Sequence, residues 1–186
     1  MTLRVRIATR DDAGTISRIR VDTWRAAYAG LIPQELLDAL DADSEAERRA
    51  ARWEELHGDP RGAELVAEVD GIPAGWAALG PSIDDDRPRS GQLYAIYARP
   101  EFWSRGVGHA LLLAAEARLR AAGFRHAHLW VLDGNQRAAS FYEAHGWYED
   151  GRTMTDERRA PHGDVVTLFE RRRVRDLSEP VASPPQ

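Results

Sequence analysis

Two glycines at the start of a helix-like segment have the spacing of an anion site. Gly106 and Gly108 follow the strand-like run 94–98 and precede the helical run 110–115. Glycine lets a ligand approach the backbone closely, and the free N–H groups and positive dipole end of a helix attract phosphate. The pair therefore predicts a phosphate-binding turn, with a plain strand-to-helix connection as the competing interpretation. No Gly-Lys-Ser/Thr follows, and Leu111 replaces the third glycine of a dinucleotide fingerprint, so both of those nucleotide sites are disfavoured.

A second segment, 129–147, joins a strand-like run to a helix that carries a phenol. Asn135 follows the apolar run and is typical of a helix N-cap. One helical stripe collects the positions spaced by three and four residues, which are Ala138, Phe141, Tyr142 and His145. Without further context, core packing is the favoured interpretation of Phe141 and Tyr142.

In this order and spacing the two segments resemble the GCN5-related N-acetyltransferase (GNAT) family, from about residue 3 to residue 173. The more specific half is the run 135–147, Asn-Gln-Arg-Ala-Ala-Ser-Phe-Tyr-Glu-Ala-His-Gly-Trp, with the glycine loop about 30 residues upstream. The resemblance implies an enzyme that moves the acetyl group of acetyl-coenzyme A to a primary amine of a small molecule. It implies direct attack in a ternary complex, with coenzyme A as cosubstrate and no metal.

The resemblance also implies which residues bind acetyl-coenzyme A. The strand would pair its backbone with the pantetheine arm, and the loop would give N–H groups to the pyrophosphate. Asn135 would hold the pantetheine, and Tyr142 would face the thioester sulfur as the catalytic acid. A phenol near pKa 10 can donate to a thiol near 8.5 without a large shift. The expected cosubstrate-binding residues are Ile96, Tyr97, Ala98, Trp103, Ser104, Arg105, Gly106, Val107, Gly108, His109, Asn135, Ala138 and Tyr142.

The acceptor pocket of the family forms between the first helices, the central strands and the last hairpin. The residues expected near it are Trp24, Tyr28, Trp76, Tyr94 and His162. Trp24 and Tyr28 are also spaced as an ordinary packed aromatic pair on a helix. The acidic run 84–86 could attract a cationic amine, or it could be a solvated loop.

Three positions depart from the family pattern, and two of them leave the general base unassigned. Trp103 stands where the loop usually opens with Gln or Arg, so phosphate contacts would rest on backbone N–H groups, with Arg99 or Arg105 as charge partners. Gln92 and Trp130 stand where relatives carry a glutamate. The open candidates for the base, acting through water, are Glu68, Asp133, His109 and His162.

Two other functions remain open at this level. A protein or peptide N-acetyltransferase would need an open groove, and a catalytically weak acyl-coenzyme A sensor would need no base. A toxin that acetylates tRNA is disfavoured by the formal net charge of −5. Many relatives form dimers, and a homodimer is neither required nor excluded by the sequence.

Hydrophobic periodicity predicts the elements that must position these residues. Helices are expected over 16–27, from 33, over 44–56, over 111–122 and over 136–145. Strands are expected over 3–7, 63–69, 72–79, 92–98, 126–132, 147–155 and 164–172, with a tight hairpin turn at Asp70-Gly71. This order predicts one α/β domain over 1–173, a mostly antiparallel mixed sheet of about seven strands with helices on both faces, and a flexible tail over 174–186.

Composition excludes several classes of protein. The chain has 186 residues and no cysteine, which argues for one domain and against disulfide scaffolds and thiolate chemistry. Its acidic balance argues against nucleic-acid partners, and no apolar stretch approaches the roughly 20 residues that span a bilayer. We therefore expect a cytoplasmic bacterial protein without a membrane partner.

Overall fold

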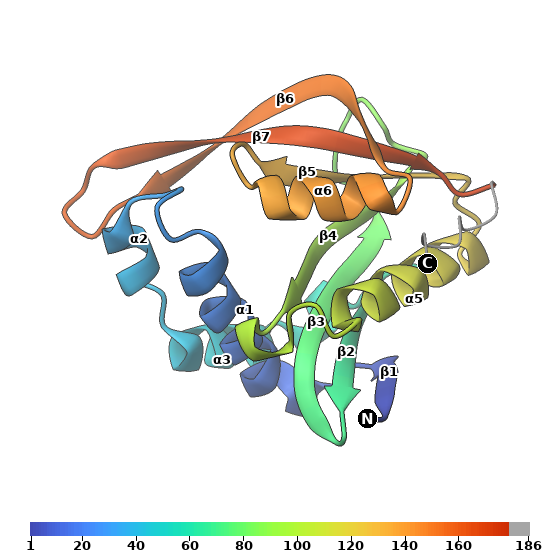
Figure 1. Ribbon diagram of the computed structural model, residues 1–186, viewed down its shortest axis with the longest axis horizontal. Coiled ribbons are helices and arrows are strands. Elements are labelled where there is room, and N and C mark those ends of the chain that lie inside the picture. The colour runs from blue at the N-terminus through green and yellow to red at the C-terminus, as the bar shows by residue number, and fades with distance from the viewer. Residues whose placement is uncertain (179–186) are drawn as a thin grey trace.

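The computed structural model describes residues 1–178 and is built on one seven-stranded sheet with the order β1-β2-β3-β4-β5-β7-β6 (Figure 1). Adjacent strands are antiparallel, except for β4 and β5, which are parallel. The strands are β1 (Leu3–Ile7), β2 (Ala63–Val69), β3 (Ile72–Pro81), β4 (Gly91–Ala98), β5 (His126–Leu132), β6 (Tyr148–Arg159) and β7 (Val165–Asp176). The predicted mostly antiparallel mixed sheet is confirmed.

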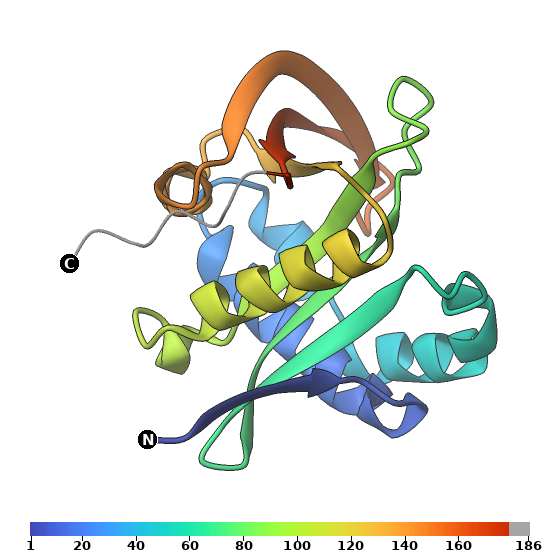
Figure 2. The same ribbon diagram turned by 90° about the vertical axis from the view of Figure 1, so that its right-hand side faces the viewer.

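Helices cover both faces of the sheet, as predicted. Figure 2 looks onto α5, which crosses one face, with α1 and α3 behind the sheet. The helices are α1 (Ala13–Ala27), α2 (Gln34–Asp38), α3 (Ala42–Ala51), α4 (Trp53–Leu56), α5 (Val107–Ala121) and α6 (Gln136–Ala144). The largest core cluster lies between α5 and the sheet, where Leu111, Leu112 and Leu119 are almost fully buried. A second cluster under α1 includes Ile16 and Ile19.

The β2–β3 hairpin forms where the Asp70-Gly71 pair predicts it. Both residues have positive φ, 49° at Asp70 and 82° at Gly71, as a two-residue turn between twisted strands requires. Apolar side chains on both faces of β2 and β3 are buried, because α5 covers one face and α1 the other. This hairpin therefore forms the central support of the sheet.

The parallel pair β4–β5 is the feature that creates the site. The two strands pair only at Gly91–Ala127 and Gln92–His128, and the chain crosses between them through α5. From Leu93 onward, β4 pairs with β3 on one side but has no strand partner on its β5 side among the described residues. The separating strands leave a gap in the sheet with an unpaired backbone edge.

Several boundaries differ from the predicted ones. The helix expected over 44–56 is two helices, α3 and α4, because the backbone at Arg52 leaves the helical region and lets Trp53 turn into the core. The last two strands are longer than predicted, and β7 continues to Asp176, beyond the predicted domain end at 173. The predicted tail is therefore partly sheet, and its residues 179–186 lie outside the described residues.

The turn end of the β6–β7 hairpin lies beside α2 (Figure 1). Leu168 on β7 packs with Ile32 and Leu37 in a third core cluster, which joins α2 to β5 and β7. The β6–β7 hairpin thereby closes the space beside α1 and α2. No helix in residues 1–178 is both long enough and apolar enough to cross a membrane.

Candidate active site

A cavity of about 550 Å³ passes through the gap between β4 and β5. Its lining comes from both faces of the sheet. We call the part formed by the glycine loop, α5 and α6 the cofactor end, and it includes Ser104, Gly108 and Ala138. We call the part on the α1 side the acceptor end, which is lined by Ala27, Tyr28, Tyr94, Tyr97, Trp130 and Leu132. A single space therefore joins the two faces of the sheet.

The glycine loop builds an anion-binding helix start at the cofactor end. Gly106 is the N-cap of α5 with φ of 81°, a left-handed conformation that glycine adopts without strain, and Ser104 also has positive φ. Within the described part of the chain, no side chain caps this helix, so its first N–H groups remain available. Gly108 lies in the first turn of α5 beside the Phe141 ring of α6, where a Cβ would lie 3.4 Å from that ring, at ordinary contact distance. These features fit a pyrophosphate group.

Trp103 connects the glycine loop to the end of β4 through a hydrogen bond. Its Nε1 donates to the carbonyl of Ala98 at 2.7 Å, which also accepts from the Thr23 hydroxyl at 3.2 Å. The Arg137 guanidinium lies 3.7 Å from the centroid of the Trp103 ring and lines the cavity. The cation at this end is therefore Arg137, which sequence reasoning did not single out. Of the expected charge partners, Arg105 lies outside the lining and Arg99 pairs with Glu101 and Asp22.

The start of α6 supplies the Asn135 side chain and the phenol. Asn135 Oδ1 accepts from the N–H of Ala138 at 3.1 Å, which is the N-cap bond that the sequence predicts. Tyr142 is 7% exposed and lines the cavity from the next turns of the helix. Burial raises the pKa of the Tyr142 phenol well above its ordinary value, and Tyr97 raises it further. The phenol stays protonated at neutral pH, so it suits hydrogen-bond donation better than full proton transfer.

A pair of histidines holds the α5–α6 contact. His145 Nδ1 lies 2.7 Å from the carbonyl oxygen of Phe141, which can only accept, so this nitrogen carries the proton. His145 Nε2 then faces His109 Nδ1 at 2.8 Å as an acceptor when the ring is neutral. His109, which lines the cavity, is therefore oriented by a defined donor–acceptor chain.

Phenols dominate the acceptor end. Burial raises the pKa of Tyr28 well above its ordinary value, and the neighbouring Tyr97 raises it further, followed by Tyr142 and Glu170. Glu170 on β7 does not line the cavity, and burial raises the pKa of its carboxyl. Sequence reasoning missed Glu170, whose position depends on how β7 packs beside α1.

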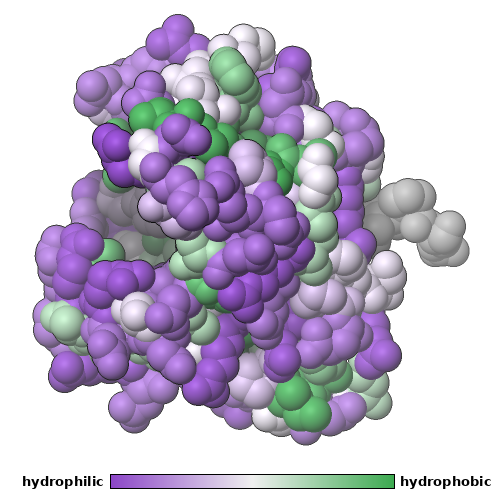
Figure 3. Space-filling model, turned by 90° about the vertical axis from the view of Figure 1, so that its left-hand side faces the viewer, coloured by the Kyte–Doolittle hydropathy of each residue, from purple (hydrophilic) through white to green (hydrophobic). Residues whose placement is uncertain are grey.

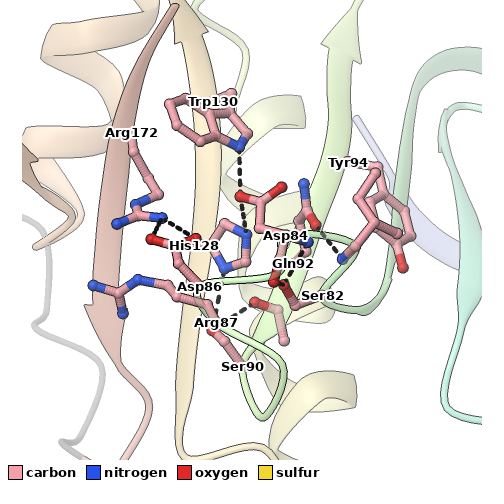
Figure 4. Close-up of polar contacts among 12 residues, drawn as sticks. Ser82, Asp84, Asp86, Arg87, Ser90, Gln92, Tyr94, His128, Trp130 and Arg172 are labelled. Carbon is pink, nitrogen blue, oxygen red and sulfur yellow. Dashed lines mark hydrogen bonds and ion pairs between the residues drawn. The ribbon is translucent and has the colours of Figure 1, made fainter. Parts of the chain in front are cut away.

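Trp130 is a wall of the cavity held by buried polar groups (Figure 4). Its Nε1 donates to Asp84 Oδ2 at 2.9 Å, and His128 Nε2 contacts the same oxygen at 3.0 Å. His128 is fully buried, with Nδ1 3.2 Å from the Ser90 hydroxyl. Asp86 in the same loop pairs with Arg172 on β7. The loop 82–90 is thus fixed to the sheet beside the cavity.

The expected cosubstrate-binding residues line this cavity, apart from Arg105. Of the expected acceptor residues, Tyr28 and Tyr94 line it, and the other three do not. Trp24 packs edge-on against Tyr28, and Trp76 turns toward α1 and donates to Glu64 at 3.0 Å. His162 is exposed in the turn between β6 and β7. Lining residues that the sequence reasoning missed are Thr23, Ala27, Leu93, Ala95, Phe102, Trp130, Val131, Leu132, Arg137, Ser140 and Phe141.

The suggested bases are dispersed. Glu68 pairs with Arg6 at the β1 side of the sheet, and Asp133 pairs with Arg171. His162 lies in the last hairpin turn, so among the suggested bases only His109 lines the cavity. The geometry assigns no general base among these four.

Comparisons with known proteins agree with this architecture. The model of the acetyltransferase (GNAT) family matches residues 24–147. The chain is 31% identical to an uncharacterized N-acetyltransferase, YuaI, of Bacillus subtilis over 108 residues, which span 58% of this chain and 59% of YuaI. The chain therefore spans less than two thirds of that curated relative.

Solved structures share the fold at low identity. The PaiA N-acetyltransferase of Thermoplasma acidophilum, in complex with coenzyme A, superposes with a TM-score of 0.72 at 19% identity, covering 95% of this chain and 99% of that one. A ribosomal-protein-alanine N-acetyltransferase of Brucella melitensis gives 0.70 at 22% identity, covering 93% and 99%.

The predicted fold and family are confirmed by these findings. The family match contains both the glycine loop and the Asn135–Trp147 segment, which together form the cofactor end of the cavity. The chain belongs to the GNAT family of acetyltransferases.

Proposed function

We propose that this protein transfers the acetyl group of acetyl-coenzyme A to the primary amine of a small molecule. The observation that carries the proposal is the continuous cavity between β4 and β5, which has an anion-binding helix start at one end and an aromatic pocket at the other. A two-substrate transfer needs such a passage, because both reactants must meet in one space.

The residues at the cofactor end suit the cosubstrate. The unpaired edge of β4 offers backbone groups to the amides of the pantetheine arm. The uncapped start of α5 and the Arg137 guanidinium suit the phosphates. Bound there, acetyl-coenzyme A supplies an activated acetyl group as a thioester.

The acetyl transfer that these groups assist is balanced in bonds and protons. A bond forms between the amine nitrogen and the carbonyl carbon, the carbon–sulfur bond breaks, and one proton leaves the nitrogen while the thiolate sulfur gains one. Tyr142 donates a hydrogen bond from its protonated phenol toward the sulfur, which stabilises the departing thiolate. Because the acceptor end has no charged lining group, it disfavours the ammonium form and favours the neutral amine that attacks.

The test is release of free coenzyme A from acetyl-coenzyme A in the presence of amines, amino acids and peptides. Amine-dependent release, lost in Tyr142→Phe with coenzyme A binding retained, supports the proposal. Binding of acetyl-coenzyme A without release by any acceptor would favour a sensor instead. Release with peptides alone would indicate that the acceptor is a protein or peptide.

A further inference from the structure

The acceptor end offers an aromatic surface without charged lining groups. Its side chains include Tyr28, Tyr97 and Trp130, together with the aliphatic Ala27 and Leu132. Among the described residues that line the whole cavity, the basic ones are His109 and Arg137, and both belong to the cofactor end. No aspartate or glutamate within residues 1–178 lines the cavity.

Two carboxylates of the acidic loop beside the acceptor end, Asp84 and Asp86, are committed to internal partners, and the exposed Asp85 does not line the cavity (Figure 4). Asp84 Oδ2 accepts a hydrogen bond from Trp130 Nε1 and faces His128 Nε2. Both carboxylate oxygens of Asp86 accept from Arg172 Nη1, at 2.9 and 2.7 Å. These carboxylates therefore hold protein groups, and they do not recruit a cationic acceptor. Glu170 on β7 lies near Tyr28 but does not line the cavity.

The same contacts make Trp130 a fixed wall. Its ring N–H is bonded to Asp84, and the Arg172 guanidinium lies 5.5 Å from its ring centroid. The fixed ring presents its remaining surface to the cavity, where flat apolar groups bury most area at low entropic cost. Figure 3 shows that the side of the molecule carrying α2 and the β6–β7 hairpin tip is mostly hydrophilic and hollowed.

We propose that the acceptor is a monoamine with an aromatic or apolar body, and this inference rests on the proposed acetyl transfer. The aromatic walls bury the body of such an amine, and the phenols of Tyr28 and Tyr97 offer oxygens to its nitrogen. A second ammonium group would lose water without meeting a carboxylate, and the carboxylate of an amino acid would meet no cation at this end. Polyamines, aminoglycosides and free amino acids are therefore poor acceptors.

Two pairs of matched amines test this inference by kcat/KM. 2-Phenylethylamine differs from phenylalanine by one carboxylate, and butylamine differs from putrescine by a second ammonium. We expect the first member of each pair to be favoured by at least about tenfold, which corresponds to about 1.4 kcal/mol. Preference for phenylalanine or putrescine would overturn the acceptor class, while leaving acetyl transfer established.

Variants of the wall test the role of Trp130 as a specificity-determining residue. Trp130→Ala should reduce the preference for 2-phenylethylamine over butylamine by about fivefold or more, because the aromatic contact is lost. Trp130→Phe should retain most of that preference, with the same KM for acetyl-coenzyme A. An unchanged preference in Trp130→Ala would contradict the inference, provided that its melting temperature matches that of Trp130→Phe.

A binding readout separates the two proposals. If no amine releases coenzyme A, calorimetric titration of the coenzyme A-loaded protein still measures the affinity of the acceptor end for 2-phenylethylamine and for phenylalanine. Tighter binding of 2-phenylethylamine by about tenfold supports the inference although the proposed function fails. Equal binding of the two compounds overturns the inference.

Discussion

Glu116 on α5 offers the sharpest stability test, because its buried carboxylate contacts Trp147, which precedes β6, and Arg175 on β7. Its side chain is 2% exposed on α5. Oε1 accepts from Trp147 Nε1 at 2.9 Å, Oε2 accepts from Arg120 at 3.0 Å, and Arg175 Nε on β7 lies 3.6 Å from Oε1. Arg175 is itself buried, with a side chain 5% exposed. Removal of the carboxylate would leave Arg175 bonded to the carbonyl oxygen of His145 but without the opposing charge of Glu116.

The expected magnitude follows from that burial. Breaking a buried ion pair by removing one partner costs about 3–5 kcal/mol, because the other charge stays buried without compensation. For a domain of this size, each kcal/mol moves the melting temperature by about 2–4 °C, so Glu116→Ala should lower it by about 6–20 °C. Glu116→Gln retains an acceptor for Trp147 and should lose less.

Urea and thermal unfolding, followed by circular dichroism, measure the effect. The matched control is Glu55→Ala, which removes an exposed carboxylate paired with Arg52 and should leave both midpoints nearly unchanged. A loss below about 1 kcal/mol in Glu116→Ala would refute the reasoning, since the buried pair would then contribute no more than a surface pair.

Three further outcomes are expected. Tyr142→Phe should lower kcat by about 100-fold while coenzyme A affinity stays within about threefold, measured by thiol release and calorimetry; equal loss of both would make the phenol a binding group. Gly106→Ala should destabilise the fold by about 1–2 kcal/mol through its left-handed φ of 81° and weaken acetyl-coenzyme A binding, whereas Gly14→Ala, in α1 with free space around it, should do neither. Burial lowers the pKa of His128, as do Arg172 and Arg87, while Asp84 opposes the shift and Ser90 accommodates either protonation state. The unfolded chain therefore binds the proton more tightly, so stability should fall as pH drops below about 6.5, and urea midpoints of His128→Gln should show a flatter pH dependence.

Local sequence signals predicted the elements well where the backbone chemistry is local. Asn135 caps α6 and Asp70-Gly71 turns the β2–β3 hairpin, because both depend on neighbouring residues alone. The ends of β6 and β7 were placed too early, since their outer residues are held by cross-strand pairing over long sequence distances.

The site required information that the sequence pattern does not carry. The pairing register between β3 and β4 shifts between Ala78 and Leu79, which interrupts the alternation of side chains along β4. Ala95 and Tyr97 therefore pack toward α1, while Leu93 and Ile96 pack toward α5. Trp76 was expected at the acceptor pocket, but its neighbours under α1 bury it instead. Glu116 interrupts an otherwise apolar helix face, and its partners Trp147 and Arg175 come from other elements.

A crystal structure with coenzyme A and 2-phenylethylamine tests the central claim most directly. The account predicts the pantetheine arm along the free edge of β4, the pyrophosphate at the start of α5, and the amine beside Tyr28 and Trp130 with its nitrogen facing the thiol. Coenzyme A bound away from the gap between β4 and β5, or an amine on the α5 side of the sheet, would contradict it.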